Sequence, residues 1–209
     1  MKKNKISKNW IRKQKKDLFF QKSKIEGYRS RSAFKLIEMN NKFKIIKKDS
    51  SLLDLGSSPG GWSQVASKII TKGKILAVDI KLMEKINNIE FIREDFAKDE
   101  TQEKIKIYFK HQADVVLSDM AANTTGNQSL DAYRTGELCL EAMGLAKKIL
   151  RKEGVFLSKI FMGSIYKEID KKAKNSFKKV IRYKPLSSKK ESKEIYIYCK
   201  GILNIWYKI

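Results

Sequence analysis

The fold is decided by residues Leu52 to Ser63, which read Leu-Leu-Asp-Leu-Gly-Ser-Ser-Pro-Gly-Gly-Trp-Ser. An apolar run that includes one acid ends in a loop of small residues. The residues that follow, 64–70, carry apolar side chains at helical spacing. The stretch therefore predicts a buried first strand, a tight turn and a first helix.

A turn of this kind favours a nucleotide or another anionic ligand. Glycines let a ligand approach the backbone, and the first N–H groups of the helix point above the strand. Gly56, Gly60 and Gly61 do not have the dinucleotide-binding spacing, and the triphosphate-binding ending G-K-[ST] is absent. Asp54 would repel phosphates and suits a ligand with an ammonium group. A glycine-rich turn without a ligand is the alternative interpretation.

The length of 209 residues and the composition indicate one well-packed domain with an extension, in a protein that works in a reducing compartment. Cys139, Cys199 and the single His111 cannot supply a disulfide framework or a Cys/His metal site, so we expect no metal. The sequence has no apolar run of membrane-spanning length and no secretory signal pattern. We therefore expect a soluble cytoplasmic protein.

The formal net charge of +23 is unevenly distributed. Residues 1–48 carry 17 basic and 3 acidic side chains, residues 49–146 carry 11 and 15, and residues 147–209 carry 18 and 5. Because 39 of the 46 basic residues are lysine, a compositional bias towards lysine could contribute to the total. A uniform bias would not leave the middle acidic, so the pattern favours a polyanion-binding surface beside a site for another ligand. Solvated lysine faces are the alternative.

Residues 1–24 are predicted to form a basic arm in front of a single domain over residues 25–209. Trp10, Phe19 and Phe20 of the arm could stack on exposed bases or pin the arm to the domain. Arg29 and Arg31 precede a helical pattern in a chain that otherwise prefers lysine. Their planar guanidinium groups favour a role in gripping RNA phosphates.

Three predicted strands end in acids. Asp54 ends the first, Asp79 lies at the end of the apolar strand 74–80, and Asp95 and Phe96 follow the strand 88–94. An acid after the second strand of a βαβ unit typically binds ribose hydroxyls. Each acid could instead cap a turn, but together they favour a nucleoside that carries a positively charged amino acid.

The remaining pattern alternates helices and strands, as in an α/β fold. Lys159 lies near the end of an apolar strand and is costly to bury unless it is paired or deprotonated. Strands are expected over 113–120, 155–161, 177–184 and 194–199, and helices over 98–109, 131–152 (closed by Gly154) and 164–174.

Several motifs resemble the FtsJ-type ribose 2′-O-methyltransferases over nearly the whole chain. They are Tyr28 to Leu36 (Tyr-Arg-Ser-Arg-Ser-Ala-Phe-Lys-Leu), Asp54 to Trp62, Ser118-Asp119-Met120-Ala121, Lys159, and Ser192 to Tyr196. The resemblance implies a Rossmann-like fold that binds S-adenosylmethionine, with a seven-stranded, mostly parallel sheet, an antiparallel last strand and helices on both faces. It also implies methylation of a uridine 2′-hydroxyl in the aminoacyl-site loop of 23S ribosomal RNA, on the assembled large subunit. Separately, we expect the protein to be a monomer.

Carried over by position, the resemblance implies a catalytic set of Lys35, Asp119, Lys159 and Glu194. It places the cofactor across Gly56, Gly60 and Trp62, with Asp79 at its ribose, Asp95 at its adenine and Asp119 between cofactor and substrate. Ala122 stands where the family pattern has proline, a departure expected to loosen the loop beside Asp119.

The required chemistry leaves the role of Lys159 open. A ribose hydroxyl is a poor nucleophile, so the enzyme has to align it and handle one proton. Lys159 could be neutral and accept that proton, or charged and stabilise the developing alkoxide. Alternatives for the whole chain are a 2′-O-methyltransferase of another RNA, a base-directed methyltransferase, a non-catalytic RNA-binding protein and a nicotinamide oxidoreductase.

Overall fold

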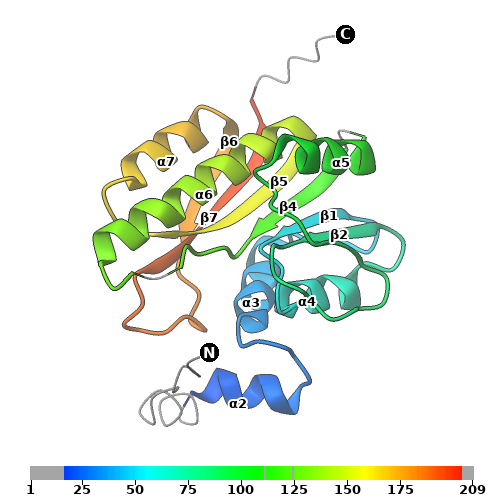
Figure 1. The fold of residues 1–209 in the computed structure, drawn as a ribbon, viewed down its shortest axis with the longest axis horizontal. Helices are drawn as coiled ribbons and strands as arrows, with labels where there is room; N and C mark the ends of the chain where they lie inside the picture. The colour runs from blue at the N-terminus through cyan, green and yellow to red at the C-terminus, as the bar shows by residue number, and fades with distance from the viewer. Residues whose placement is uncertain (1–16, 111, 124, 204–209) are drawn as a thin grey trace, which may run out of the picture.

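The structure is a computed structural model that describes residues 17–110, 112–123 and 125–203. Its centre is a seven-stranded sheet in the order β3-β2-β1-β4-β5-β7-β6 (Figure 1). Neighbouring strands from β3 to β5 pair in parallel, whereas β7 pairs antiparallel with both β5 and β6. The predicted mostly parallel sheet with an antiparallel last strand is confirmed.

The elements alternate along the chain in the expected way. The strands are β1 (Ser51–Leu55), β2 (Lys74–Val78), β3 (Glu90–Ile92), β4 (Ala113–Ser118), β5 (Leu150–Phe161), β6 (Phe177–Tyr183) and β7 (Glu194–Ile202). The described helices are α2 (Leu18–Ile25), α3 (Ala33–Phe43), α4 (Gly61–Ile69), α5 (Asp99–Phe109), α6 (Gln128–Ile149) and α7 (Tyr166–Lys174).

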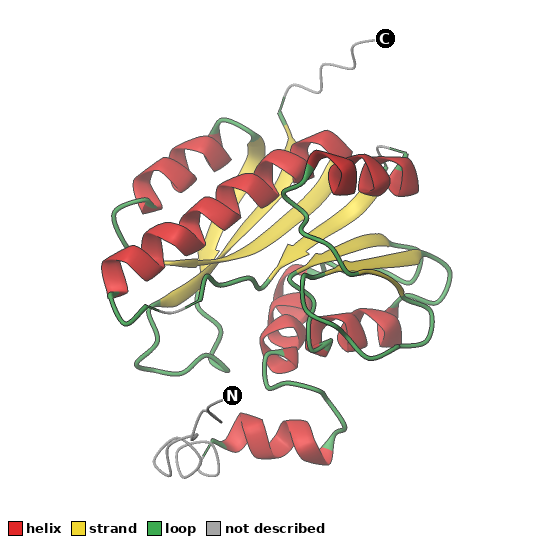
Figure 2. Ribbon diagram, viewed as in Figure 1, coloured by secondary structure: helices red, strands yellow, loops and turns green. Residues whose placement is uncertain are grey.

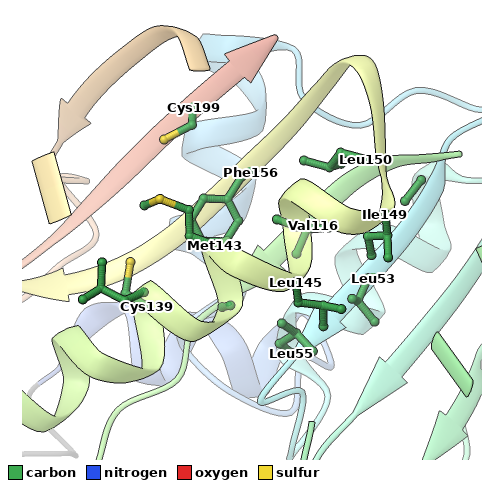
Figure 3. Packing of buried hydrophobic residues seen from close by; sticks show 14 of the residues in the cluster. Leu53, Leu55, Val116, Cys139, Met143, Leu145, Ile149, Leu150, Phe156 and Cys199 are labelled. Atoms are coloured by element: carbon green, nitrogen blue, oxygen red, sulfur yellow. The ribbon is translucent and has the colours of Figure 1, made fainter. Parts of the chain in front are cut away.

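Helices cover both faces of the sheet (Figure 2). Alternate side chains of β1 point to opposite faces: Leu53 packs in the cluster covered by α5, α6 and α7, and Leu52 in the cluster covered by α3 and α4. Figure 3 shows part of the first cluster, with Phe156 of β5 beside Met143 of α6. Because both faces of the strands are buried, the strands read in the sequence as nearly continuous apolar runs.

The helix expected over residues 131–152 is shifted towards the N-terminus. It begins at Gln128, because the Asn127 side-chain oxygen accepts hydrogen bonds from the backbone N–H groups of Ser129 and Leu130 at 3.1 and 3.2 Å. It ends at Ile149 rather than near Gly154, because Leu150 already pairs with Ala113 of β4. Pairing within the sheet therefore overrides the helical pattern at this end, and the expectation that Gly154 closes the helix is wrong.

The expected basic arm lies mainly outside the described residues, as does Trp10. Its described part forms α2, whose Phe19 ring lies 5.6 Å from the Phe34 ring of α3, measured between centroids. Phe19 therefore pins α2 to the domain. The helix α2 spans the predicted boundary between the arm (1–24) and the domain (25–209). The division itself stays a prediction.

The carboxyl ends of β1, β2 and β4 meet at one edge of the sheet, and α3 lies close to the same edge (Figure 1). In an open α/β sheet, ligands bind at this edge beside the point where the strand order reverses, here between β1 and β4. None of the described helices is long and apolar enough to span a bilayer.

Candidate active site

Two adjoining cavities lie at the carboxyl ends of β1, β2 and β4. The larger, of about 310 Å³, is lined by side chains that include Asp79, Asp95, Phe96 and Leu138. The smaller, of about 160 Å³, is lined by Asp54, Trp62 and the loop between them. Both cavities share Gly56, Ser58 and Asp119.

The turn after β1 requires glycine at two of the predicted cofactor positions. Gly56 has a positive φ of 70°, and a Cβ atom there would lie 2.2 Å from the Met120 side chain. Gly60 has a φ of 109° and directly precedes α4. Glycine adopts this conformation at little cost, so the turn can pass beside Met120 and present its backbone to the cavities.

Asp79 and Asp95 line the larger cavity and also close their own turns. The Asp79 carboxylate accepts hydrogen bonds from the backbone N–H groups of Ser58, at 2.9 Å, and Lys81, at 2.7 Å. The Asp95 carboxylate accepts one from the Ala97 N–H at 3.0 Å. Capping and ligand contact are therefore compatible for both acids, and their contacts with ribose and adenine stay predictions.

Asp54 is a buried acid without a cationic partner among the described side chains. Its carboxylate, in a residue only 1% exposed, accepts a hydrogen bond from the Ser63 hydroxyl at 2.6 Å. Burial raises the pKa of Asp54 to about 7, and the negative charges of Asp119 and Asp79 add to the effect. The smaller cavity is therefore suited to a cationic group such as an ammonium.

Trp62 connects the cofactor turn to the other half of the site. Its indole N–H donates to the Ser32 carbonyl oxygen at 2.9 Å, which ties α4 to the start of α3. Its ring centroid lies 5.8 Å from that of Tyr196 in β7. The residue that follows Gly60 and Gly61 thus packs against the strand that carries Glu194.

The four residues of the predicted catalytic set form two ion pairs beside the cavities. The Lys159 ammonium lies 3.0 Å from the Asp119 carboxylate and also donates to the Asp119 backbone oxygen at 2.5 Å. The Lys35 ammonium lies 2.7 Å from the Glu194 carboxylate. These side chains are only 10 to 17% exposed, so water screens the pairs weakly.

Tyr196 joins the two ion pairs and was missed as a site residue by the sequence analysis. Its hydroxyl donates to the Asp119 carboxylate at 2.7 Å, and the Lys35 ammonium lies 5.7 Å from its ring centroid. The strand period could have indicated it, because Tyr196 is two residues from Glu194 and therefore on the same face of β7. Burial raises the pKa of the Tyr196 hydroxyl well above its usual range, and Asp119 and Glu194 raise it further.

Asp119 is ionised despite its burial. Burial alone would raise its pKa, but Lys159, Lys35 and the Tyr196 hydroxyl together hold the pKa of the Asp119 carboxyl below its usual range. The arrangement brings two ammonium groups and two carboxylates close to Tyr196. It can align a polar substrate group and stabilise charge that develops on it.

Arg29 and Arg31, the predicted RNA-binding arginines, have partners within the protein. Arg29 donates to the backbone oxygens of Pro59, Glu84 and Lys85 at 3.3, 2.6 and 3.0 Å. Arg31 pairs with Asp17 and donates to the Ser187 backbone oxygen at 2.5 Å. Both hold loops around the site in place, and RNA contact by either stays a prediction.

Ala122 stands where the family pattern has proline. Its backbone N–H makes a hydrogen bond that proline, which has no N–H, could not make. Its N–H donates to the Thr135 hydroxyl of α6 at 3.2 Å. The loop that follows Asp119 is thereby attached to α6, so the expected loosening of this loop has a local compensation.

The chain is similar to known proteins in sequence. The sequence model of the FtsJ-like methyltransferase family matches residues 28–202. The chain is 54% identical to a Pelagibacter ubique protein named Ribosomal RNA large subunit methyltransferase E, over 96% of this chain and 98% of the relative. A Rickettsia bellii protein of the same name is 46% identical over 91% of this chain and 87% of the relative.

Solved structures share the fold. A Plasmodium falciparum protein, provisionally identified as a ribosomal RNA methyltransferase, superposes with a TM-score of 0.76 and 32% identity, covering 85% of this chain and all of that one. A provisionally identified methyltransferase of Streptococcus mutans, solved with SAH, has a TM-score of 0.53 and 15% identity, covering 79% of this chain and 96% of that one.

Proposed function

Because the chain belongs to the FtsJ-like methyltransferase family, we propose that it uses S-adenosylmethionine to methylate the 2′-hydroxyl of a uridine in 23S ribosomal RNA. The uridine lies in the aminoacyl-site loop, and the substrate is the assembled large subunit in the cytoplasm, bound by a monomer. The names of the 54% and 46% identical relatives support a large-subunit RNA substrate. The observation that carries the proposal is the pair of Lys–acid contacts, joined by Tyr196, of which Asp119 lines both cavities.

The residues of the two cavities fit S-adenosylmethionine. Asp54 would face the ammonium of its methionine part, which would relieve the burial of an unpaired carboxylate. Asp79 would bind the ribose hydroxyls, and Asp95 with Phe96 would hold the adenine. Gly56, Gly60 and Trp62 shape the turn between them. When bound, this cofactor supplies a sulfonium methyl group that is already activated for transfer.

The chain itself positions the substrate oxygen and stabilises its charge. The ribose hydroxyl gives up its proton to solvent as negative charge develops on its oxygen. The Lys159 side-chain nitrogen contacts two oxygens of Asp119, the carboxylate and the backbone carbonyl. We therefore assign it to stabilising the developing alkoxide, with Lys35 and Glu194 orienting the ribose. Asp119 holds the Lys159 ammonium at the boundary between cofactor and substrate.

Basic segments flank the catalytic set, which supports a polyanionic substrate. α2 presents Lys22 and Lys24, and the loop between β6 and β7 presents Lys189 and Lys190. Arg31 connects the two segments. It pairs with Asp17 at the start of α2 and donates to the backbone oxygen of Ser187 in that loop. Binding that depends on such phosphate contacts weakens steeply as salt rises, because counterions are released.

The proposal is tested by incubating the protein with labelled S-adenosylmethionine and either naked 23S ribosomal RNA or intact large subunits. We expect label on the subunits, at one uridine, and recovery of 2′-O-methyluridine after digestion to nucleosides. A methyl group on the base would assign the chain to the base-directed class. No label on any RNA, together with no heat of cofactor binding in calorimetry, would overturn the enzymatic proposal.

A further inference from the structure

A third cavity, of about 460 Å³, lies beside the catalytic set and has no role in the function described above. Its walls come from the start of α6, the segment after β5 and the end of the loop between β6 and β7, three segments that lie at one edge of the sheet (Figure 1). Its volume falls in the range of about 300–1,000 Å³ that is usual for small-molecule sites.

The cavity begins two residues from the catalytic lysine. Phe161, in its wall, follows Lys159 by two residues in β5, which is about 6.6 Å along a strand. Phe161 also pairs in the sheet with Glu194 of β7. The Met162 N–H donates to the Lys193 backbone oxygen at 3.2 Å, which joins the two walls directly beside Glu194.

The lining is unsuited to a phosphate. Asp131 and Glu191 contribute carboxylates, which repel anions, and Lys193 already donates to the Gln128 side-chain oxygen at 2.9 Å. The first N–H groups of α6 are not available to an anion either, because the Asn127 side chain accepts hydrogen bonds from two of them. An anionic ligand would therefore gain little here.

The same lining matches a nucleobase. With its oxygen occupied by Lys193, the Gln128 amide keeps its N–H groups as donors. The Asp131 carboxylate already accepts two hydrogen bonds from Thr125, so the Glu191 carboxylate is the acceptor offered to a ring N–H. Met162, which is 45% exposed, offers an apolar surface to a base. Uracil presents both carbonyl acceptors and a ring N–H.

We propose that this cavity binds the nucleobase of the nucleotide whose ribose enters the catalytic set. The base and the 2′-oxygen are attached to neighbouring carbons of the ribose, so the base must lie close to Lys159. Proteins that modify a nucleotide within folded RNA commonly take its base out of the stack and hold it in a pocket. The inference rests on the proposed function, because it presupposes an RNA substrate.

The first test is ultraviolet cross-linking of the full chain to large ribosomal subunits in the presence of S-adenosylhomocysteine. We expect uridine adducts on peptides that contain residues 128–133 or Met162, as mapped by mass spectrometry. Adducts found only on other peptides would overturn the inference, and this readout does not require catalysis.

The second test compares Gln128→Ala with Gln112→Ala as a matched control. Gln112 is also exposed, but it lies directly before the first residue of β4, whereas the site lies at the carboxyl end of this strand. We expect Gln128→Ala to raise the KM for large subunits about tenfold, with unchanged cofactor affinity, and Gln112→Ala to change the KM by less than about twofold. Equal KM values for both variants, in a protein that does methylate the subunits, would overturn the base pocket and leave the proposed function standing. Adducts at the cavity without any methyl transfer would support the pocket while overturning the proposed reaction.

Discussion

Asp54 is fully buried and Asp119 is mostly buried, with its side chain 17% exposed. Both lie at or just beyond the carboxyl ends of two neighbouring strands, β1 and β4, yet their pKa values shift in opposite directions. Asp54 receives one hydrogen bond from Ser63, and burial raises its pKa to about 7. Burial would also raise the pKa of Asp119, but Lys159 and Lys35 more than compensate and hold it below its usual range. Two aspartates of one sheet therefore have different surroundings: Asp119 is paired with cations of the protein, and Asp54 is not.

The difference shows where each half of the site obtains its positive charge. The catalytic half contains its own cations, so its ion pairs are complete in the folded protein. The half at the β1 turn lacks a cation beside Asp54 among the residues that the structure describes, which fits a cationic ligand. Breaking the first arrangement should stop the reaction, whereas changing the second should alter ligand binding.

The largest effect is expected for Lys159→Met. Without its ammonium, the developing charge on the substrate oxygen is unstabilised, and methyl transfer should fall at least about 10³-fold, which is ~4 kcal/mol of barrier. The affinity for S-adenosylmethionine, measured by calorimetry, should change by only a few fold. Lys152→Met, an exposed lysine in the same strand, is the control and should retain normal turnover. Normal turnover of Lys159→Met would contradict the assignment.

A second large effect concerns cofactor affinity and its pH dependence. Only ionised Asp54 attracts an ammonium, so the affinity of the wild type for S-adenosylmethionine should increase as the pH rises through about 7. Asp54→Asn should lower the affinity at pH 8 about 10- to 100-fold and remove this dependence. Asp49→Asn, at an exposed aspartate just before β1, is the control. The comparison fails if both variants bind the cofactor with the same pH profile.

Whereas cofactor affinity should increase with pH, the stability of the ligand-free protein should decrease as the pH rises. Because folding raises the pKa of Asp54 from about 4 to about 7, the folded state binds this proton more tightly than the unfolded state. The contribution is fully present below pH 4 and is lost as the pH rises through 7, up to about 4 kcal/mol. In urea unfolding, Asp54→Asn should therefore flatten the decline between pH 5 and pH 8. A decline unchanged from the wild type would assign it to other groups.

Tyr196→Phe should have a smaller effect on turnover. It removes one hydrogen-bond donor from Asp119, but Lys159 still holds that carboxylate. We expect kcat to fall about tenfold, in proportion to one charge-assisted hydrogen bond, with little change in cofactor affinity. Tyr198→Phe, in the same strand, is the control, since Tyr198 stacks on Phe43 away from the ion pairs. Equal kcat values in the two variants would show that the Tyr196 hydroxyl does not contribute to catalysis.

The smallest effect is expected for Ala122→Pro, which introduces the residue of the family pattern. It removes the N–H that donates to Thr135, so unfolding free energy should fall by about 1 kcal/mol. Thr135→Val removes the same hydrogen bond from its other side. If the bond accounts for the loss, the double variant should be about as stable as the less stable single variant. Additive losses in thermal unfolding would show that each residue acts separately.

The sequence by itself determined the local parts of this protein. Apolar runs that end in acids marked β1 and β2, and the small residues from Gly56 to Gly61 marked the turn that opens the cavities. These features depend on backbone geometry and burial within a few residues, which is why the patterns revealed them. The catalytic residues were identified by resemblance, since no local pattern connects Lys35 with Glu194.

Only the tertiary structure decided which charges meet and which groups are already occupied. It paired Lys35 with Glu194 and Lys159 with Asp119, and it placed Tyr196 between the two pairs. It also gave Arg29 and Arg31 partners inside the protein. It also ended α6 at Ile149, because pairing of Leu150 in the sheet outweighed the helical pattern. The physical reason is that the charge state of a buried group, and the end of an element, depend on neighbours distant in sequence.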